Sequence, residues 1–152
     1  MNKLMLSIVL ALTLGAGYSP TAMSQAKPEV LVKQRQAVMT LQGKYFGPMA
    51  GMADGKVPFN AAIIARNAAY LDVLDKMAWD GFDASTKDEK SRALPEIYSN
   101  AAKFKAEQDE LQAKVTMLVS ASKGGDEAAM KAAIGAISKT CGSCHDTFRE
   151  KR

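Results

Sequence analysis

The amino-acid sequence predicts an all-α fold, an antiparallel up-down bundle of four helices. Two observations lead to this fold class. Apolar residues recur at three- and four-residue steps along four segments, which is the period of a helix buried on one side. Sustained alternation of apolar and polar residues, which is typical of strands, is absent. Because most connections between the segments are short, consecutive helices are expected to run antiparallel.

The first 24 residues have the pattern of a secretory signal peptide. Lys3 supplies a basic start, residues 4–17 are almost wholly apolar, and Ala22-Met23-Ser24 provides the small residues that a signal peptidase reads. A membrane anchor needs about 20 apolar residues, and this run is shorter and broken by glycines. We expect residues 1–24 to be cleaved after export, leaving residues 25–152 as one periplasmic domain without membrane attachment.

The first two helices are each bounded by recognisable residues. The first is expected to begin near Pro28, a good first-turn residue, and to end at the breakers between Gly51 and Pro58. The second opens at Asn60, a plausible N-cap, and stops at Asp80-Gly81. Their stripes are Leu31, Arg35, Val38, Gln42, Tyr45 and Met49, then Ile64, Asn67, Leu71, Leu74 and Ala78.

A polar stretch without apolar period, residues 81–94, is predicted to be the longest loop. Pro95 and Glu96 begin the third helix, which runs to Gly124-Gly125, and Asp126 caps the fourth. The third stripe is Ile97, Ala101, Phe104, Gln108, Leu111, Val115 and Leu118. The fourth is Met130, Ile134, Ile137, Cys141, Cys144 and Phe148, which places both cysteines on the buried face.

Cys141-Gly142-Ser143-Cys144-His145 matches the attachment motif of c-type haem. Residues three and four apart share one face of a helix, so two thiols at this spacing can bond to the two vinyl groups at one porphyrin edge. The adjacent imidazole is then carried to the iron. We predict one covalently attached haem c, held by Cys141 and Cys144 and ligated by His145.

Other uses of this motif fit the chain less well. An exported cysteine pair usually forms a disulfide, but within one helix such a bridge constrains little. A thioredoxin-type pair expects a strand–helix setting, and a structural zinc ion needs four ligands, whereas the chain has two cysteines and one histidine. With His145 as the only histidine, the sixth position of the iron falls to methionine, another residue or water, or stays empty.

Charge and residue types argue against two broad functions. The formal net charge is +4, but the lysines are scattered among acidic residues instead of forming one basic stripe, so nucleic acid is not an expected partner. A single histidine committed to iron leaves no nucleophile–base pair, so the chain is not expected to be an enzyme.

A haem motif at the C-terminal end of a four-helix chain resembles the class II cytochromes c, and among them cytochrome c′. Class I cytochromes carry this motif near the N-terminus. The resemblance covers essentially all of the chain after residue 24. Further matching stretches are Lys33-Gln34-Arg35-Gln36 followed by Met39, then Ala78-Trp79, Pro95-Glu96-Ile97 and Arg149.

The resemblance implies roles that the residues alone do not give. It implies that Arg35 and Gln36 lie beside the haem propionates and haem edge, and that Met39 lies over the vacant face of the iron. It also implies that Trp79 packs beside the haem and that Arg149 lies near the proximal imidazole.

The resemblance also implies a function and an assembly. The implied function is that of a five-coordinate haem iron that binds NO and CO or transfers electrons. The implied assembly is a homodimer formed through the first two helices. Surplus apolar residues at Ile63, Tyr70 and Met77 suit such an interface, or a wide core face. One alternative is a six-coordinate, low-spin electron carrier with Met39 as axial ligand. Another is a haem-free helical binding module. The redox partner protein cannot be identified from the sequence.

Overall fold

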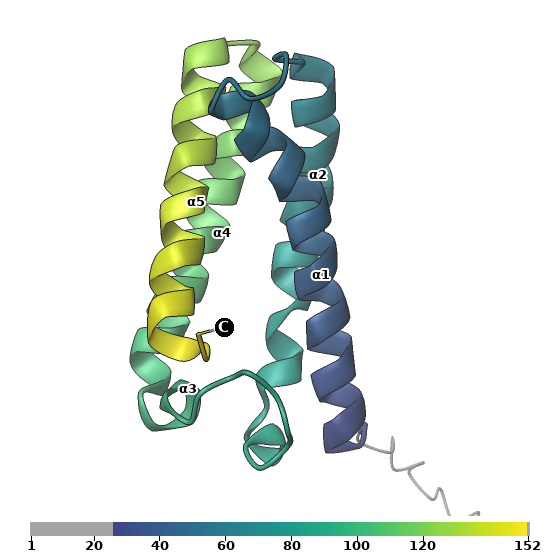
Figure 1. The fold of residues 1–152 in the computed structure, drawn as a ribbon, viewed down its shortest axis with the longest axis vertical. Coiled ribbons are helices and arrows are strands. Elements are labelled where there is room, and N and C mark those ends of the chain that lie inside the picture. The colour runs from purple at the N-terminus through teal and green to yellow at the C-terminus, as the bar shows by residue number, and fades with distance from the viewer. Residues whose placement is uncertain (1–25, 152) are drawn as a thin grey trace, which may run out of the picture.

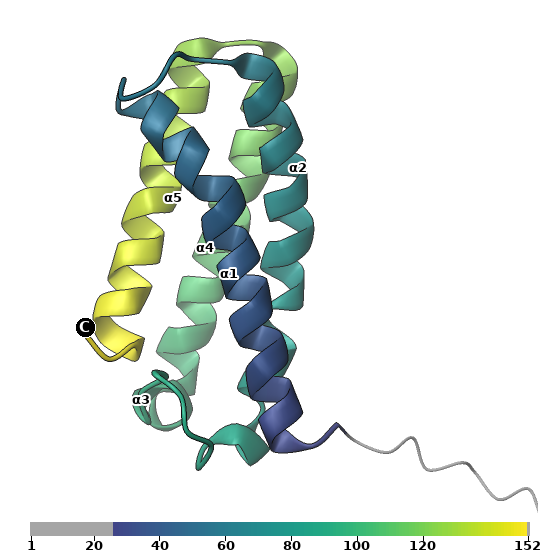
Figure 2. The ribbon, with the colours of Figure 1, turned by 45° about the vertical axis from the view of Figure 1, so that its right-hand side comes forward.

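The computed structural model describes residues 26–151, and their long helices form an up-down-up-down bundle (Figure 1). The long helices are α1 (Pro28–Ala53), α2 (Ala61–Met77), α4 (Ala101–Gly124) and α5 (Glu127–Phe148). Helices α1 and α2 pack together, as do α4 and α5, and α2 packs against α4 (Figure 2). The predicted all-α four-helix bundle is confirmed, while the predicted signal peptide, residues 1–24, lies outside the described residues.

Most of the predicted helix boundaries are confirmed by capping geometry. Asn60 accepts a hydrogen bond from the backbone N–H of Ile63 at 3.0 Å, and Asp126 accepts one from Ala129 at 3.1 Å. These bonds satisfy donors that the first turn of a helix leaves free. Gly125 ends α4 in the left-handed conformation, with φ of 74°, which glycine adopts at little cost.

The third predicted helix is wrong in one respect, because it is not continuous from Pro95. A short helix α3 (Glu96–Ser99) is separated from α4 by Asn100, whose φ of −123° and ψ of 49° are not helical. Asparagine is a weak helix former because its side chain competes for backbone hydrogen bonds. The break lets α3 contact α5 as well as α4, and Ala101, expected to be buried, is exposed.

The second predicted helix also ends earlier than expected. The α-helix stops at Met77, and the 3₁₀ helices η1 (Trp79–Phe82) and η2 (Ala84–Thr86) follow. Both pack against α1. Gly81 allows this approach, because a Cβ there would lie 2.5 Å from the Cβ of Arg35 and 2.8 Å from the carbonyl oxygen of Leu31. The expected loop at 81–94 is therefore partly helical and tied to the bundle.

The interior divides into two clusters. The main core joins all four long helices through residues that include Met49, Ile64, Leu118 and Ile134. A second, aromatic cluster lies around Ile97, Phe104 and Phe148, with Trp79, Phe82, Ala93, Tyr98 and Cys144 packed against it. The aromatic cluster gathers residues of the 78–98 connection around the C-terminal end of α5.

The segment before α3 pairs with the end of the chain. Leu94 donates to the carbonyl of Phe148 at 3.0 Å, and Glu150 donates to the carbonyl of Arg92 at 2.9 Å, around an antiparallel bridge between Ala93 and Arg149. The Arg92 guanidinium also donates to the Glu150 carbonyl. This pairing fixes the chain directly after the Cys141–His145 motif.

One face of α2 exposes large apolar side chains. Tyr70, Val73 and Met77 are 45, 57 and 54% exposed and share a face at three- and four-residue spacing. The Tyr70 ring packs on Tyr45 of α1, with the centroids 4.9 Å apart. Ile63, for which the sequence left open an interface or a wide core face, packs against the main core. Within residues 26–151, every helix is too short or too polar to cross a membrane.

Candidate functional site

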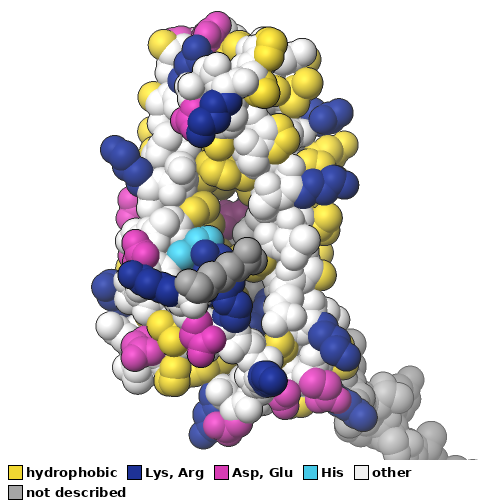
Figure 3. Space-filling view, viewed as in Figure 1, with side chains coloured by type: hydrophobic (Ala, Val, Ile, Leu, Met, Phe, Trp, Pro, Cys, Tyr) yellow, Lys and Arg dark blue, Asp and Glu magenta, His cyan; other side chains and the backbone are white. Residues whose placement is uncertain are grey.

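A cavity of about 460 Å³ lies between α1, η1, α4 and α5. Figure 3 shows a hollow in the surface between α1 and α5, with the histidine side chain (cyan) beside it. Every site residue predicted from the sequence lines this one cavity, although these residues come from distant parts of the chain. They are Arg35, Gln36, Met39, Trp79, Cys141, Cys144, His145 and Arg149.

The motif residues occupy the last two turns of α5. The Cys141, Cys144 and His145 side chains are half-buried at the cavity wall, and the two thiols are not joined by a disulfide. The helix ends immediately afterwards, where the Arg149 N–H donates to the His145 carbonyl at 3.2 Å and Arg149 turns to extended geometry. The spacing of the motif and the end of the helix directly after it place both sulfurs and the imidazole at the same cavity.

Both cysteines are held as protonated thiols by their surroundings. Burial, and secondarily the charge of Asp75, raises the pKa of Cys141. Burial also raises the pKa of Cys144 to about 11, with the charge of Glu107 adding to it. Since the thiolate is the reactive form of cysteine, the folded chain keeps both sulfurs in their less reactive state.

The imidazole of His145 is held neutral. Burial lowers its pKa, and the positive charge of Arg149 and, more weakly, of Arg92 lowers it further against the opposing charge of Asp146. A neutral imidazole has a free nitrogen lone pair, which is the form that ligates a metal.

Arg35 forms both the cavity wall and the anchor of the neighbouring loop. Its side chain is 3% exposed, and its guanidinium donates to the Gly81 carbonyl at 2.7 Å and to Thr86 Oγ1 at 3.0 Å. A further bond reaches Ser91 Oγ at 2.8 Å, and the guanidinium carbon lies 4.5 Å from the centroid of the Phe82 ring.

The other α1 residues follow from helical spacing. Met39 lies one turn after Arg35 on the same face and is half-buried, whereas Gln36 is mostly exposed at the cavity rim. A methionine thus lies on the α1 wall, and the imidazole of His145 belongs to the α5 wall.

The size and polarity of the cavity suit a haem. Its volume is within the range of about 300–1,000 Å³ found for ligand pockets, and aromatic residues line it beside the two thiols. Trp79 Nε1 and Glu107 Oε2 are buried without a hydrogen-bond partner in the described part of the chain. Because buried polar atoms normally have partners, an indole donor left free here is expected when the ligand itself supplies an acceptor.

Several residues at the site were not predicted from the sequence. Phe82, Ser91 and Arg92 line the cavity from the 81–94 connection, where no periodicity indicates burial. Glu107 could have been found, since it lies three residues after Phe104 and four before Leu111, which both belong to the α4 stripe. Asp75, which does not line the cavity but whose charge acts on Cys141, could have been found too, since it lies four residues after Leu71 and three before Ala78 of the α2 stripe.

Comparison with known proteins gives a consistent result. Residues 30–149 match the family model described as Cytochrome C′. Cytochrome c′ of Rubrivivax gelatinosus is 41% identical over 126 residues, covering 82% of this chain and 98% of that protein. The crystal structure of cytochrome c′ from the same organism is 40% identical, with a TM-score of 0.78 over 82% of this chain and 98% of that one. A nitric oxide complex of a cytochrome c′ variant from Alcaligenes xylosoxidans is 38% identical, with a TM-score of 0.78, covering 84 and 99% of the two chains.

Proposed function

The chain belongs to the cytochrome c′ family, whose members carry a single covalently attached c-type haem, and we propose that Cys141 and Cys144 form the thioethers and His145 ligates the iron. The observation that carries this proposal is the convergence of both thiols and a neutral imidazole on one cavity. The bound haem would supply an iron that changes oxidation state and takes up small ligands. The protein residues would determine which edge of the haem is bonded, how the haem is oriented and how far solvent reaches it.

We propose that His145 is the only protein ligand of the iron, which leaves the opposite face open. The chain has a single histidine, and Met39 on the α1 wall would act as a steric block over the open face. A pocket of this kind admits small neutral diatomics such as NO and CO, because they need little hydrogen bonding. The NO complex of a relative supports this reading.

The remaining site residues are assigned supporting roles. Arg35, Gln36 and the free Trp79 N–H would lie near the polar edge of the haem, with Arg35 also holding the adjacent loop. Arg149 would keep positive charge beside the proximal imidazole, where it already lowers the pKa of His145. Reversible reduction of the bound haem would serve electron transfer.

A second candidate is a six-coordinate electron carrier in which Met39 itself ligates the iron. The position of Met39 on the cavity wall permits this assignment too. The two differ in spin state, because a thioether as sixth ligand gives low-spin iron that does not take up CO readily.

We further propose that the protein is exported to the periplasm and forms a homodimer. Export rests on the signal pattern of residues 1–24. Dimerisation rests on the exposed face of α2 at Tyr70, Val73 and Met77, because apolar side chains clustered on one helix face are typical of an interface.

The first experiment is a set of optical spectra on the exported protein, after mass spectrometry has tested for one covalent haem. High-spin spectra that shift on adding CO support the open site, and sharp low-spin ferrous bands insensitive to CO support Met39 ligation. The variant Met39→Leu separates the two assignments further, because replacing Met39 changes the spin state of the iron only if Met39 is a ligand. Met117→Leu, at an exposed methionine, is the control. A mass without added haem contradicts the assignment and favours a haem-free binding module.

A further inference from the structure

Asp75 on α2 is a buried carboxylate that none of the proposed haem contacts uses. It is 1% exposed, and it is the only acidic side chain among the buried residues of the described chain. Its Oδ1 has no hydrogen-bond partner there. The nearest lysine in sequence, Lys76, pairs with Asp72 at 2.9 Å instead. Within the described residues, Asp75 therefore lacks full hydrogen bonding and forms no ion pair.

Asp75 is not one of the residues that line the cavity, but its neighbours on α2 connect it to the cavity wall. Trp79, one turn later, lines the cavity, as do Gln42 and Cys141. Gln42 donates to the carbonyl of Leu74, the residue before Asp75, at 3.3 Å. The negative charge of Asp75 raises the pKa of the Cys141 thiol. The carboxylate is thus electrostatically coupled to the sulfur to which one edge of the haem would be bonded.

The surroundings place Asp75 near the balance point between its two protonation states. Burial, with the nearby charge of Asp72, raises the pKa of Asp75 to about 7, while Lys76 opposes the rise. A carboxyl with such a pKa is part protonated and part ionised at neutral pH. A change of one charge nearby in a region of low dielectric therefore shifts its protonation strongly.

We propose that Asp75 is the proton-coupling residue of this cytochrome, binding one proton when the haem is reduced and releasing it when the haem is oxidised. The inference rests on the proposed haem attachment. When a one-electron donor reduces the iron, the electron removes one positive charge from the cavity, and a carboxylate oxygen of Asp75 takes one proton from solvent. Oxidation returns both, and no bond to the iron forms or breaks. The ionised carboxylate favours the ferric state, so the reduction potential falls as pH rises.

Other charged groups near Asp75 must be separated from it. On its own helix these are Asp72 and Lys76. From α5 the group is Cys141, which does not titrate once bonded to haem. Glu107 of α4 lines the cavity, and so do three cationic side chains and one imidazole. These are Arg35, Arg92 and Arg149, and His145. The haem propionates add two further carboxylates.

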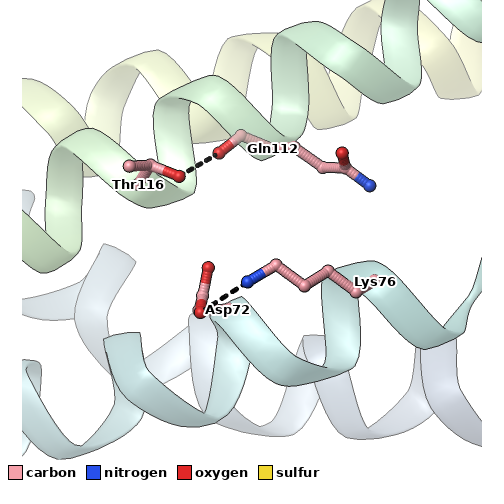
Figure 4. A network of polar contacts seen from close by, with 4 residues as sticks. All are labelled: Asp72, Lys76, Gln112 and Thr116. Carbon is pink, nitrogen blue, oxygen red and sulfur yellow. Dashed lines mark hydrogen bonds and ion pairs between the residues drawn. The ribbon is translucent and has the colours of Figure 1, made fainter.

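Asp72 provides the matched control. It lies one turn before Asp75 on α2 and pairs with Lys76 at the surface that faces Gln112 and Thr116 of α4 (Figure 4). Asp72→Asn removes the same charge from the same helix. Because the charge of Asp72 contributes to the raised pKa of Asp75, this variant should keep the pH dependence and move it to lower pH.

The test is a spectroelectrochemical titration of the haem-bearing protein from about pH 5 to about pH 9. Coupling of one proton to one electron changes the redox equilibrium at most tenfold per pH unit, which is about 59 mV. The wild type should show a falling segment near neutral pH, Asp72→Asn should retain it, and Asp75→Asn should lose it. A potential independent of pH in the wild type, or a falling segment that survives in Asp75→Asn, overturns the inference. A protein without haem would instead refute the proposed function.

A measurement on the wild type keeps the inference testable if Asp75→Asn does not fold. Infrared difference spectra between the reduced and oxidised protein should contain the C=O band of a protonated carboxylic acid in the reduced state. Labelling the protein with aspartate carrying ¹³C in the side-chain carboxyl should shift this band, whereas a haem propionate band would stay. Absence of a label-sensitive band overturns the proposal.

Discussion

Replacing Arg35 by methionine should destabilise the protein by about 3 kcal/mol. The substitution keeps an apolar stem of similar length but removes the guanidinium donors to Gly81 and Thr86, both of which are buried. A hydrogen bond that involves a charged group contributes about 1.5–3 kcal/mol. Two such bonds give about 3 kcal/mol at the lower value, and the lower value applies because Thr86 Oγ1 keeps its bond to Asp83.

Urea unfolding of the haem-bearing protein, combined with hydrogen exchange, checks this reasoning. Lys33→Met, at an exposed position on the same helix, should change stability by less than about 0.5 kcal/mol. Amide exchange in residues 81–91 should rise in Arg35→Met and stay unchanged in the control. A loss below about 1 kcal/mol, or a loss without faster exchange in this segment, would show that Arg35 does not anchor the loop.

Three further predictions concern single positions. Gly81→Ala should lower stability by about 2 kcal/mol, because its Cβ would lie 2.5 Å from a carbon of α1. Gly135→Ala, with open space around it, should raise stability by about 1 kcal/mol, and equal urea midpoints for the two variants would refute the difference. Met39→Ala should speed CO binding about tenfold, as if about 1.4 kcal/mol of steric barrier were removed; flash photolysis measures it, with Met117→Ala as control, and an unchanged rate excludes the steric role. Because the pKa of Asp75 is raised from 3.8 to about 7, the folded state holds a proton that the unfolded chain releases, and wild-type stability falls between these values. The free energy of unfolding of Asp75→Asn relative to wild type should therefore increase by up to about 4 kcal/mol from about pH 4 to about pH 8. Urea unfolding that shows the same difference in stability at both pH values would contradict this.

Helix number, order and most ends could be predicted because they depend on local signals. The caps at Asn60 and Asp126 act within one turn, and Gly125 ends its helix through its own backbone freedom. The attachment motif is local in the same sense, since its spacing and its helix determine where its three side chains point. These features need no knowledge of what the rest of the chain packs against.

The features that sequence reasoning missed depend on contacts between distant segments. Nothing in the polar composition of residues 81–94 indicates that Arg35, 46 residues before Gly81, organises them. The break at Asn100 serves the packing of α3 on α5, which no periodicity within the segment reports. The pairing of Arg92 with Glu150 likewise joins two segments that are each unremarkable alone.

The position of Arg35 links the stability of the loop to the integrity of the site. Its side chain lines the cavity while its guanidinium binds the connection that carries Phe82 and Ser91 to the same wall. A bundle of straight helices alone would bring only α1, α4 and α5 to the cavity, and the remaining wall comes from this connection. The loop is itself paired through residues 92–94 with the chain after His145. A substitution that frees the loop therefore disturbs the wall of the cavity and the chain after His145 together, even where it replaces no residue proposed to contact the haem.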